Sequence, residues 1–129
     1  MSRLLLDTHL LIWTLDPSGR LPALVRMLAG DPGNEILFRT VSIWEIAIKM
    51  RLGRADFDVP PSGIAHAALA TGFVELPVRW PAAALVADLP LHHRDPFDRI
   101  IVAQAMTEEV PLYTVDARLA VYSPLVRVV

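Results

Sequence analysis

Residues 4–13 read LLLDTHLLIW, and the first four of them decide the fold. Leu4, Leu5 and Leu6 form a short continuous apolar run, which is typical of a strand buried on both faces of a sheet. Asp7 follows at once, and the residues after it favour a helix up to Leu15. A buried strand leading directly into a helix is the repeating unit of α/β folds.

The alternation of strands and helices continues to the end of the chain. Besides the first pair, strands are expected at 36–41, 74–76, 112–115 and 125–129, helices at 21–29, 42–52, 62–70, 82–89 and 96–106, and a loop at 56–61. This order predicts an α/β fold with a mainly parallel sheet of four or five strands. The length of 129 residues fits a single domain, 1–129.

Capping residues predict where several helices begin. Ser42 and Glu45 match a capping box, in which each side chain bonds the backbone of the other residue. Ser18 and Ser62 are expected to cap the helices that follow them. Asp95 suits an N-cap because Pro96 follows at the first helical position.

Composition excludes several classes of protein. The chain is 53% hydrophobic and 20% charged, which excludes disorder as its main state, and charges interrupt every apolar run, so no membrane span is expected. The net charge of -2 excludes a binder that holds nucleic acid through a wide basic face. The chain contains no cysteine, so a metal site would use oxygen or imidazole ligands. The lack of cysteine and of an export signal is consistent with a cytoplasmic location, which we expect.

Acidic residues follow the predicted strands or begin the helices after them. They are Asp7, Glu45, Asp98 and Asp116. In an open parallel sheet, binding sites form beyond the carboxyl ends of the strands, so the topology would bring these acids together. Carboxylates about 5 Å apart repel each other by roughly 3 kcal/mol at an effective dielectric near 20, so the cluster would need a cation or raised pKa values. Oxygen ligands favour Mg²⁺ or Mn²⁺.

Each acid also has a structural explanation. Glu45 completes the capping box, Asp98 favours the positive end of its helix, and Asp116 can cap residues 117–121. Asp7 is harder to explain in this way, because a carboxylate directly after a buried strand is costly unless it is paired or binds a cation. The joint placement of the four acids at one edge therefore favours a site.

Four segments of the chain resemble the PIN-domain nucleases, and specifically the VapC toxins of toxin–antitoxin pairs. They are LLLDTHLLIW (4–13), VSIWEIAIKMRLGR (41–54), LPLHHRDPFDRIIVAQA (89–105) and LYTVDARL (112–119). The resemblance implies a three-layer α/β/α fold and a Mg²⁺- or Mn²⁺-dependent endoribonuclease that hydrolyses RNA. It also implies a homodimer that is neutralised by a cognate VapB-type antitoxin.

The resemblance assigns the family's catalytic acids to Asp7, Glu45, Asp98 and Asp116. The segment HRDPFDR contains two aspartates, of which Asp98 aligns best with the family's acid, leaving Asp95 as a cap or supporting residue. We expect Asp7 and Asp98 to bind the metal directly and Glu45 to bind or orient a water as base. Asp116 would complete the ligand set of this ion or hold a second one. The chain departs from the family's small-residue pattern before Ser42, where it carries Arg39 and Thr40.

Further residues are expected around these acids. Thr8 and Thr114 would donate hydroxyl hydrogen bonds to the acids or to water, Thr114 as a substrate-binding residue, and His9 would support Asp7. Arg94 and Arg99 flank the acids of their segment and would hold RNA phosphates or recruit acidic residues of the antitoxin. The pair His92 and His93 offers a rival mechanism that uses the ribose 2'-hydroxyl.

Other functions use the same chemistry or the same scaffold. A structure-selective DNA nuclease would need the same acids, and a non-catalytic PIN-like module would retain them for structure or for binding a partner. A phospho-receiver domain also gathers acids around Mg²⁺, but it needs a second acid beside Asp7 and a lysine after the last strand. The single lysine, Lys49, lies in the helix of Glu45 instead.

Overall fold

The computed structural model describes residues 2–53 and 59–129, so part of the loop expected at 56–61 lies outside the described residues. Its five strands pair in the order β3-β2-β1-β4-β5, and all four pairings are parallel. The strands are β1 (Arg3–Leu6), β2 (Glu35–Arg39), β3 (Val74–Leu76), β4 (Leu112–Thr114) and β5 (Val126–Val128). The predicted parallel sheet is therefore confirmed.

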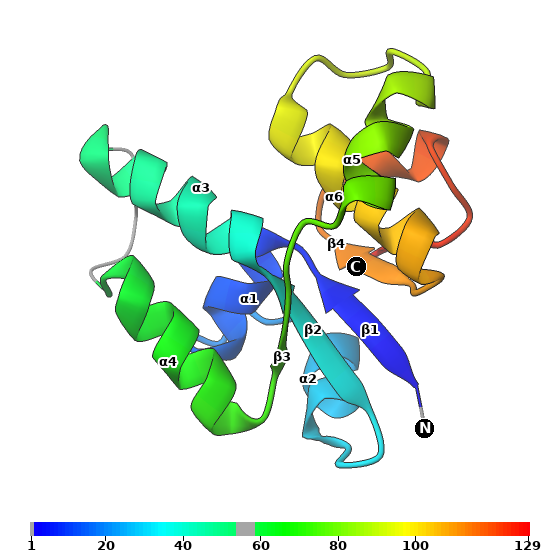
Figure 1. Cartoon of the computed structure of the whole chain (residues 1–129). Helices are drawn as coiled ribbons and strands as arrows, with labels where there is room; N and C mark the ends of the chain where they lie inside the picture. Colours follow the sequence, from blue (N-terminus) through cyan, green and yellow to red (C-terminus); the bar gives the residue numbers. More distant parts are fainter. Residues whose placement is uncertain (1, 54–58) are drawn as a thin grey trace.

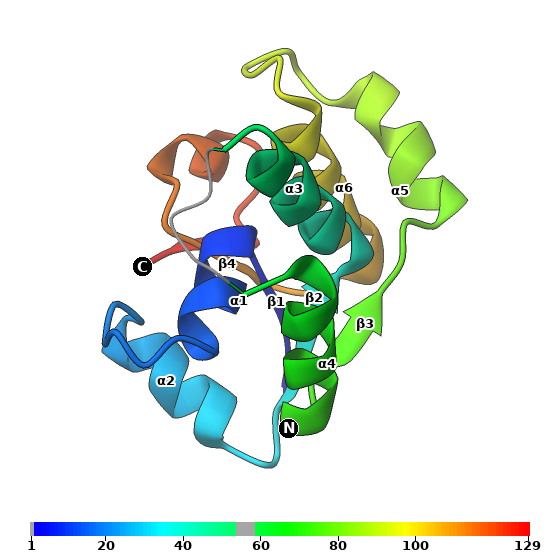
Figure 2. The same ribbon diagram turned by 90° about the vertical axis from the view of Figure 1, so that its left-hand side faces the viewer.

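Helices cover both faces of this sheet (Figure 1, Figure 2). One layer contains α1 (Thr8–Thr14), α2 (Ala23–Gly30), α3 (Thr40–Arg51) and α4 (Pro61–Thr71). The other contains α5 (Trp80–Leu85), α6 (Pro96–Glu108) and the 3-10 turns η1 (Val86–Asp88) and η2 (Ala117–Val121). This is the expected three-layer arrangement. In the described ranges, no helix combines the length and the apolar character needed to cross a bilayer.

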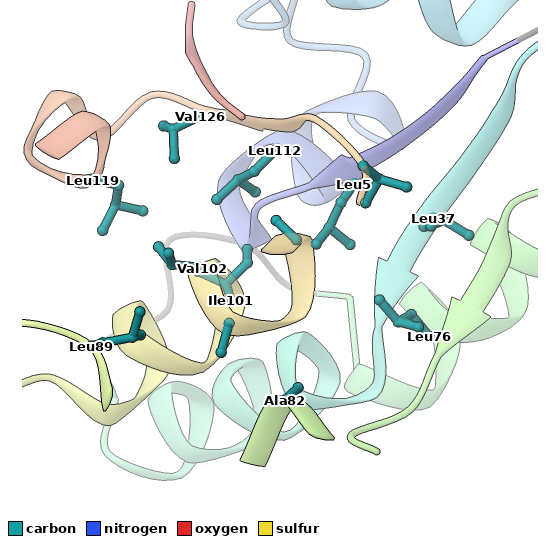
Figure 3. Packing of buried hydrophobic residues seen from close by; sticks show 13 residues of the cluster. Leu5, Leu37, Leu76, Ala82, Leu89, Ile101, Val102, Leu112, Leu119 and Val126 are labelled. Carbon is teal, nitrogen blue, oxygen red and sulfur yellow. The ribbon is translucent and has the colours of Figure 1, made fainter. Parts of the chain in front are cut away.

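The alternation of side chains along the strands builds two cores. Leu5 faces α6 together with Leu37 and Leu112, as Figure 3 shows. Leu4 and Leu6 point to the opposite face, where α1 to α4 pack. Successive strand residues point to opposite faces, so a strand whose residues are all apolar is covered on both sides. The Leu4–Leu6 run therefore anchors both layers.

The strand order creates a reversal point beside β1. The chain proceeds from β1 outward through β2 to β3, and then returns to place β4 on the other side of β1. Connections that diverge from neighbouring parallel strands leave a crevice beyond their carboxyl ends, which is where α/β proteins bind ligands. Asp7 follows β1 directly, and Asp116 lies two residues after β4.

The structure corrects the predicted start of α3. This helix begins at Thr40 with Arg39 as its N-cap residue, so the expected capping box of Ser42 and Glu45 is wrong. Ser42 is fully buried within the first turn, and its hydroxyl contacts Thr8 instead of its own helix end. Strand β2 correspondingly ends at Arg39, earlier than expected.

Two other expected caps are also wrong. The helix expected after Ser18 begins at Ala23, with Pro22 as its N-cap residue. The helix expected after Ser62 begins at Pro61, one residue before the serine, where the fixed φ of proline suits the first turn. The predicted caps Asp95 and Asp116 are confirmed, because their side chains accept hydrogen bonds from Phe97 N and Arg118 N.

Candidate functional site

A pocket of about 410 Å³ opens at the carboxyl edge of the sheet, beside the reversal point. The four acids expected at this edge, Asp7, Glu45, Asp98 and Asp116, all line it. Asp95, Thr8, His9 and Thr114, which we predicted as supporting or substrate-binding residues, line it as well. The topology thus brings together side chains from the ends of β1 and β4 and from helices α3 and α6.

Asp7 lies at the centre of the hydrogen bonds that join β1 to β4. Its side chain caps α1 by accepting from Leu10 N at 2.8 Å through Oδ1. Its Oδ2 accepts from the Thr114 hydroxyl at 2.6 Å and from Val115 N at 3.1 Å. A carboxylate has about four acceptor sites, so these three bonds fix the side chain and leave it able to bind a cation.

Glu45 is held from several directions on α3. Its Oε1 lies 2.9 Å from the Thr8 hydroxyl, and its Oε2 lies 2.9 Å from Lys49 Nζ, one helical turn away. The Thr8 hydroxyl is also 2.9 Å from the Ser42 hydroxyl. A carboxylate can only accept, so Thr8 donates its single proton to Glu45 and accepts from Ser42. Thr8 therefore supports Glu45 rather than Asp7.

Arg39 is buried beside this group. Only 2% of the residue is exposed, and its Nη2 lies 3.3 Å from the Thr8 hydroxyl and 3.8 Å from Glu45 Oε1. Burial lowers the pKa of Arg39 to about 10, while the negative charges of Glu45, Asp7 and Asp98 oppose this decrease. Arg39 therefore stays positively charged at neutral pH.

Asp95 and Asp98 both lie at the start of α6. Asp95 caps the helix with its Oδ1, which accepts from Phe97 N at 2.8 Å. Asp98 is half-buried in the first turn, and desolvation, together with the negative charges of Asp95 and Asp116, raises its pKa. Burial and the neighbouring carboxylates both disfavour the ionised form of Asp98, and a cation bound nearby would oppose them.

Asp116 is paired with Arg118 at the start of η2. The Arg118 guanidinium donates to both carboxylate oxygens, with Nε 3.0 Å from Oδ1 and Nη2 2.7 Å from Oδ2. This pairing lowers the pKa of Asp116 and raises that of Arg118. Arg118 Nη2 also lies 3.8 Å from Asp98 Oδ2, so one exposed arginine faces two of the expected metal ligands.

The pocket is acidic and offers hard oxygen ligands. Five carboxylates line it against three cationic side chains, Arg39, Lys49 and Arg118. Among residues 2–53 and 59–129, no group of three or more His, Cys, Asp or Glu side chains is arranged to hold a metal ion. The donor chemistry and the excess of carboxylates over cations fit Mg²⁺ or Mn²⁺, but Asp116 and Arg118 would have to separate before Asp116 joined a ligand set.

The structure places other predicted residues elsewhere. Within the described chain, neither Arg94 nor Arg99 lines the pocket. The Arg99 guanidinium instead donates to backbone carbonyls, including those of Val86 and Leu89 at 2.8 and 3.1 Å, and so holds the turn before α6. The rings of His92 and His93 pack against Tyr122, at centroid distances of 5.1 and 5.5 Å.

The cations of the pocket were not predicted. Lys49 follows Glu45 by four residues, a helical spacing that the sequence displays and that favours an ion pair. Arg118 follows Asp116 by two residues, which gives no comparable signal on its own. Arg39 stands out in the sequence only as an arginine at the end of an apolar strand.

Solved structures share this fold. One match is VapBC2 from Rickettsia felis, which was solved bound to a DNA fragment from the VapBC2 promoter. The TM-score is 0.69 and the identity 12%, and the match covers 98% of this chain and 97% of that one. The chain also matches a toxin–antitoxin complex from Klebsiella pneumoniae, with a TM-score of 0.63 and 23% identity over 95% of this chain and 94% of that one. At these identities the likeness shows the fold alone. A comparison with curated proteins finds no match.

A family model describes nearly the whole chain. The match to the PIN domain model spans residues 4–123. This span includes all five carboxylates of the pocket, the whole of β2, β3 and β4, and β1 from Leu4 onward. The parallel sheet and the acids gathered at its carboxyl edge agree with that match. The chain belongs to the PIN domain family.

Proposed function

We propose that this chain is a divalent-metal-dependent endoribonuclease and the VapC-type toxin of a toxin–antitoxin pair, acting in the cytoplasm. PIN domains are generally nucleases. The observation that carries the proposal is the pocket itself, in which Asp7, Glu45, Asp98 and Asp116 converge from distant segments. Glu45 and Asp98 are not the N-cap residues of their helices, so capping does not explain why they line the pocket beside Asp7 and Asp116.

The residues of the pocket would have distinct tasks. Asp7 and Asp98 would hold a Mg²⁺ or Mn²⁺ ion, because Asp7 is held rigidly and a cation would oppose the desolvation and the neighbouring negative charges that raise the pKa of Asp98. Such an ion activates a water and stabilises charge on the phosphate during hydrolysis. Glu45 would orient the attacking water through Oε2, which Lys49 contacts and Thr8 does not, and Asp116 would complete the ligand set. Arg118 is exposed beside these acids and can contact the phosphate that enters.

The partners would be RNA, a VapB-type antitoxin and a second copy of the chain. Both structural matches come from toxin–antitoxin assemblies. An apolar groove of about 400 Å³ is lined by Trp44, Phe97 and Ile100, among others, and Phe97 also lines the acidic pocket. Trp44 is 61% exposed, so this groove offers apolar surface for a protein partner.

The test is cleavage by the purified chain of single-stranded RNA and of DNA with the same sequence. We expect cleavage of RNA with Mg²⁺ or Mn²⁺, none with EDTA, and none of the DNA. Asp98→Asn should lower the rate by about 100-fold or more, since it removes a metal ligand from the reaction. Asp88→Asn, a change to an exposed acid on η1, is the matched control and should retain activity.

Three outcomes would contradict the proposal. Cleavage that persists in EDTA would exclude the metal, and cleavage of DNA in preference to RNA would favour a DNA nuclease. A chain that neither cleaves nor binds Mn²⁺ by calorimetry would be a non-catalytic module. Asp98 is a better choice than Asp7 for this test, because Asp7→Asn would place an amide donor against Val115 N and disturb the fold.

A further inference from the structure

Arg39 is an unusual side chain for the interior of this fold. It ends the central strand β2 and is 2% exposed, yet it lines the acidic pocket. Within the described part of the chain, its Nε and Nη1 are buried without a hydrogen-bond acceptor. A buried cation with unsatisfied donors is destabilising unless nearby negative charge compensates it. The negative charge that compensates Arg39 must therefore come from the acids of the pocket.

The compensation comes mainly from Glu45. Arg39 Nη2 lies 3.8 Å from Glu45 Oε1 and shares the Thr8 hydroxyl with it. Lys49 Nζ contacts the other carboxylate oxygen at 2.9 Å. Glu45 is thus opposed by two cations, whereas no cationic side chain of the described residues hydrogen-bonds Asp7.

The pocket has two ends, one with Glu45, Arg39 and Lys49, and the other with Asp98, Asp116 and Arg118. The two ends differ in whether every cation can move away from the acids. Arg118 is 67% exposed, so its guanidinium can swing into solvent when an ion approaches Asp98 and Asp116. Arg39 is 2% exposed at the end of β2, so its guanidinium cannot swing into solvent in this way. A dication beside Glu45 would therefore face a fixed positive charge in a poorly solvated place, where electrostatic repulsion is strongest.

We propose that Arg39 occupies the place of a cation at the Glu45 end, so that the pocket binds one divalent ion, at the Asp7, Asp98 and Asp116 end. Glu45 is then not a metal ligand. Arg39 acts as a positioning residue that holds the Thr8–Glu45 pair in place and excludes a second ion. This inference rests on the proposed metal-dependent function and specifies its ligand set.

The test is calorimetric titration of the intact chain with Mn²⁺, without substrate. We expect one Mn²⁺ per wild-type chain. Glu45→Gln should change its affinity by less than about threefold, whereas Asp98→Asn should weaken it by about tenfold or more. Arg39→Met, which keeps the volume and removes the charge, should bind a second Mn²⁺, and this second ion should be lost again in the Arg39→Met/Glu45→Gln double variant.

Lys49→Met is the matched control, because it removes the other, solvent-accessible cation from the same carboxylate. It should still bind one ion. Thermal unfolding establishes that each variant is folded; if Arg39→Met does not fold, the comparison of Glu45→Gln with Asp98→Asn decides.

Several results would overturn the inference. Two ions in the wild type, a tenfold loss of affinity in Glu45→Gln, or a single ion in a folded Arg39→Met variant would each do so while leaving the proposed function standing. Absence of Mn²⁺ binding by the wild type would overturn both.

Discussion

Both ends of the acidic pocket pair acids with cations, but only the Glu45 end has a buried cation. At one end, Glu45 faces Arg39, whose side chain is 2% exposed. At the other, Asp98 and Asp116 face Arg118, whose side chain is 67% exposed. Water screens and displaces an exposed ion pair, whereas a buried one is fixed by packing. An acid is therefore available to an incoming cation only where its partner is exposed.

The two acids at the Arg118 end differ in the direction of their pKa shifts. Asp98 is desolvated and lies near Asp95 and Asp116, so its pKa is raised although Arg118 is nearby. Asp116 receives both donors of Arg118, so its pKa is lowered. One arginine thus satisfies one acid of this end and leaves the other with excess negative charge. The following predictions test this contrast between the two ends.

The largest expected effect is on stability, at Asp7, which joins β1 to β4 beside the exposed end of the pocket. Asp7→Ala removes the acceptor of Leu10 N, the Thr114 hydroxyl and Val115 N. We expect a loss of about 3 kcal/mol in the free energy of unfolding, because a helix cap and bonds to a buried carboxylate disappear together. Urea denaturation measures this loss, with Asp88→Ala as control. A loss below about 1 kcal/mol would show that Asp7 does not hold β1 to β4.

The next effect is on metal binding at the exposed end. Arg118→Ala removes the guanidinium that faces Asp116 and Asp98, so Mn²⁺ should bind roughly threefold to tenfold more tightly at low salt. The gain should shrink as salt is added, since an exposed charge is screened. Calorimetry measures the affinity, and Arg79→Ala, which alters an exposed arginine outside the pocket, should leave it unchanged. Weaker binding in Arg118→Ala would mean that Arg118 helps to form the metal site.

A smaller effect concerns pH. The raised pKa of Asp98 means that the folded state holds this proton more readily than the unfolded chain does. The protonated carboxyl favours folding at low pH, and this contribution is lost as pH rises through the raised pKa. Asp98→Asn should therefore be more stable than the wild type at pH 7, by roughly 0.5 kcal/mol.

This advantage should disappear below about pH 4, near the unfolded pKa of an aspartate. Urea denaturation in EDTA at several pH values measures it. The advantage would be absent at neutral pH if Arg118 already compensated Asp98 fully.

The smallest effect is expected at Lys49. The pair with Glu45 is exposed on the lysine side, and Arg39 still compensates Glu45 when the lysine is lost. Lys49→Ala should cost roughly 0.3 kcal/mol, the usual contribution of a pair four residues apart on a helix. Thermal unfolding measures it. A loss above about 1 kcal/mol would mean that Lys49, and not Arg39, mainly compensates the negative charge of Glu45.

The helix ends show how far local pattern carried the prediction. Asp95 and Asp116 were correctly expected as caps, because each cap bonds to a backbone group only two residues away. The capping box of Ser42 and Glu45 failed although its pattern was equally good. Ser42 and Glu45 contact Thr8 across the pocket, and this long-range contact outweighed the local bonds.

The arginines show more clearly what a local sequence pattern does not predict. Arg99 was expected to face substrate, but the carbonyls of the turn before α6 accept its donors. Arg39 and Arg118 were not expected in the pocket, although both line it. An arginine side chain is long and reaches several elements, so its partner depends on which of them lie near it in space.

The sequence alone determined that strands alternate with helices and that Asp7 and Asp116 follow strands. Both properties depend on apolar runs and on neighbours in the chain, which a sequence displays directly. The structure alone decided which cation faces which acid, and whether that cation is buried at the end of β2 or exposed at the surface. Those pairings join residues far apart in the chain, and burial, which sets the strength of each pair, exists only after the layers have packed.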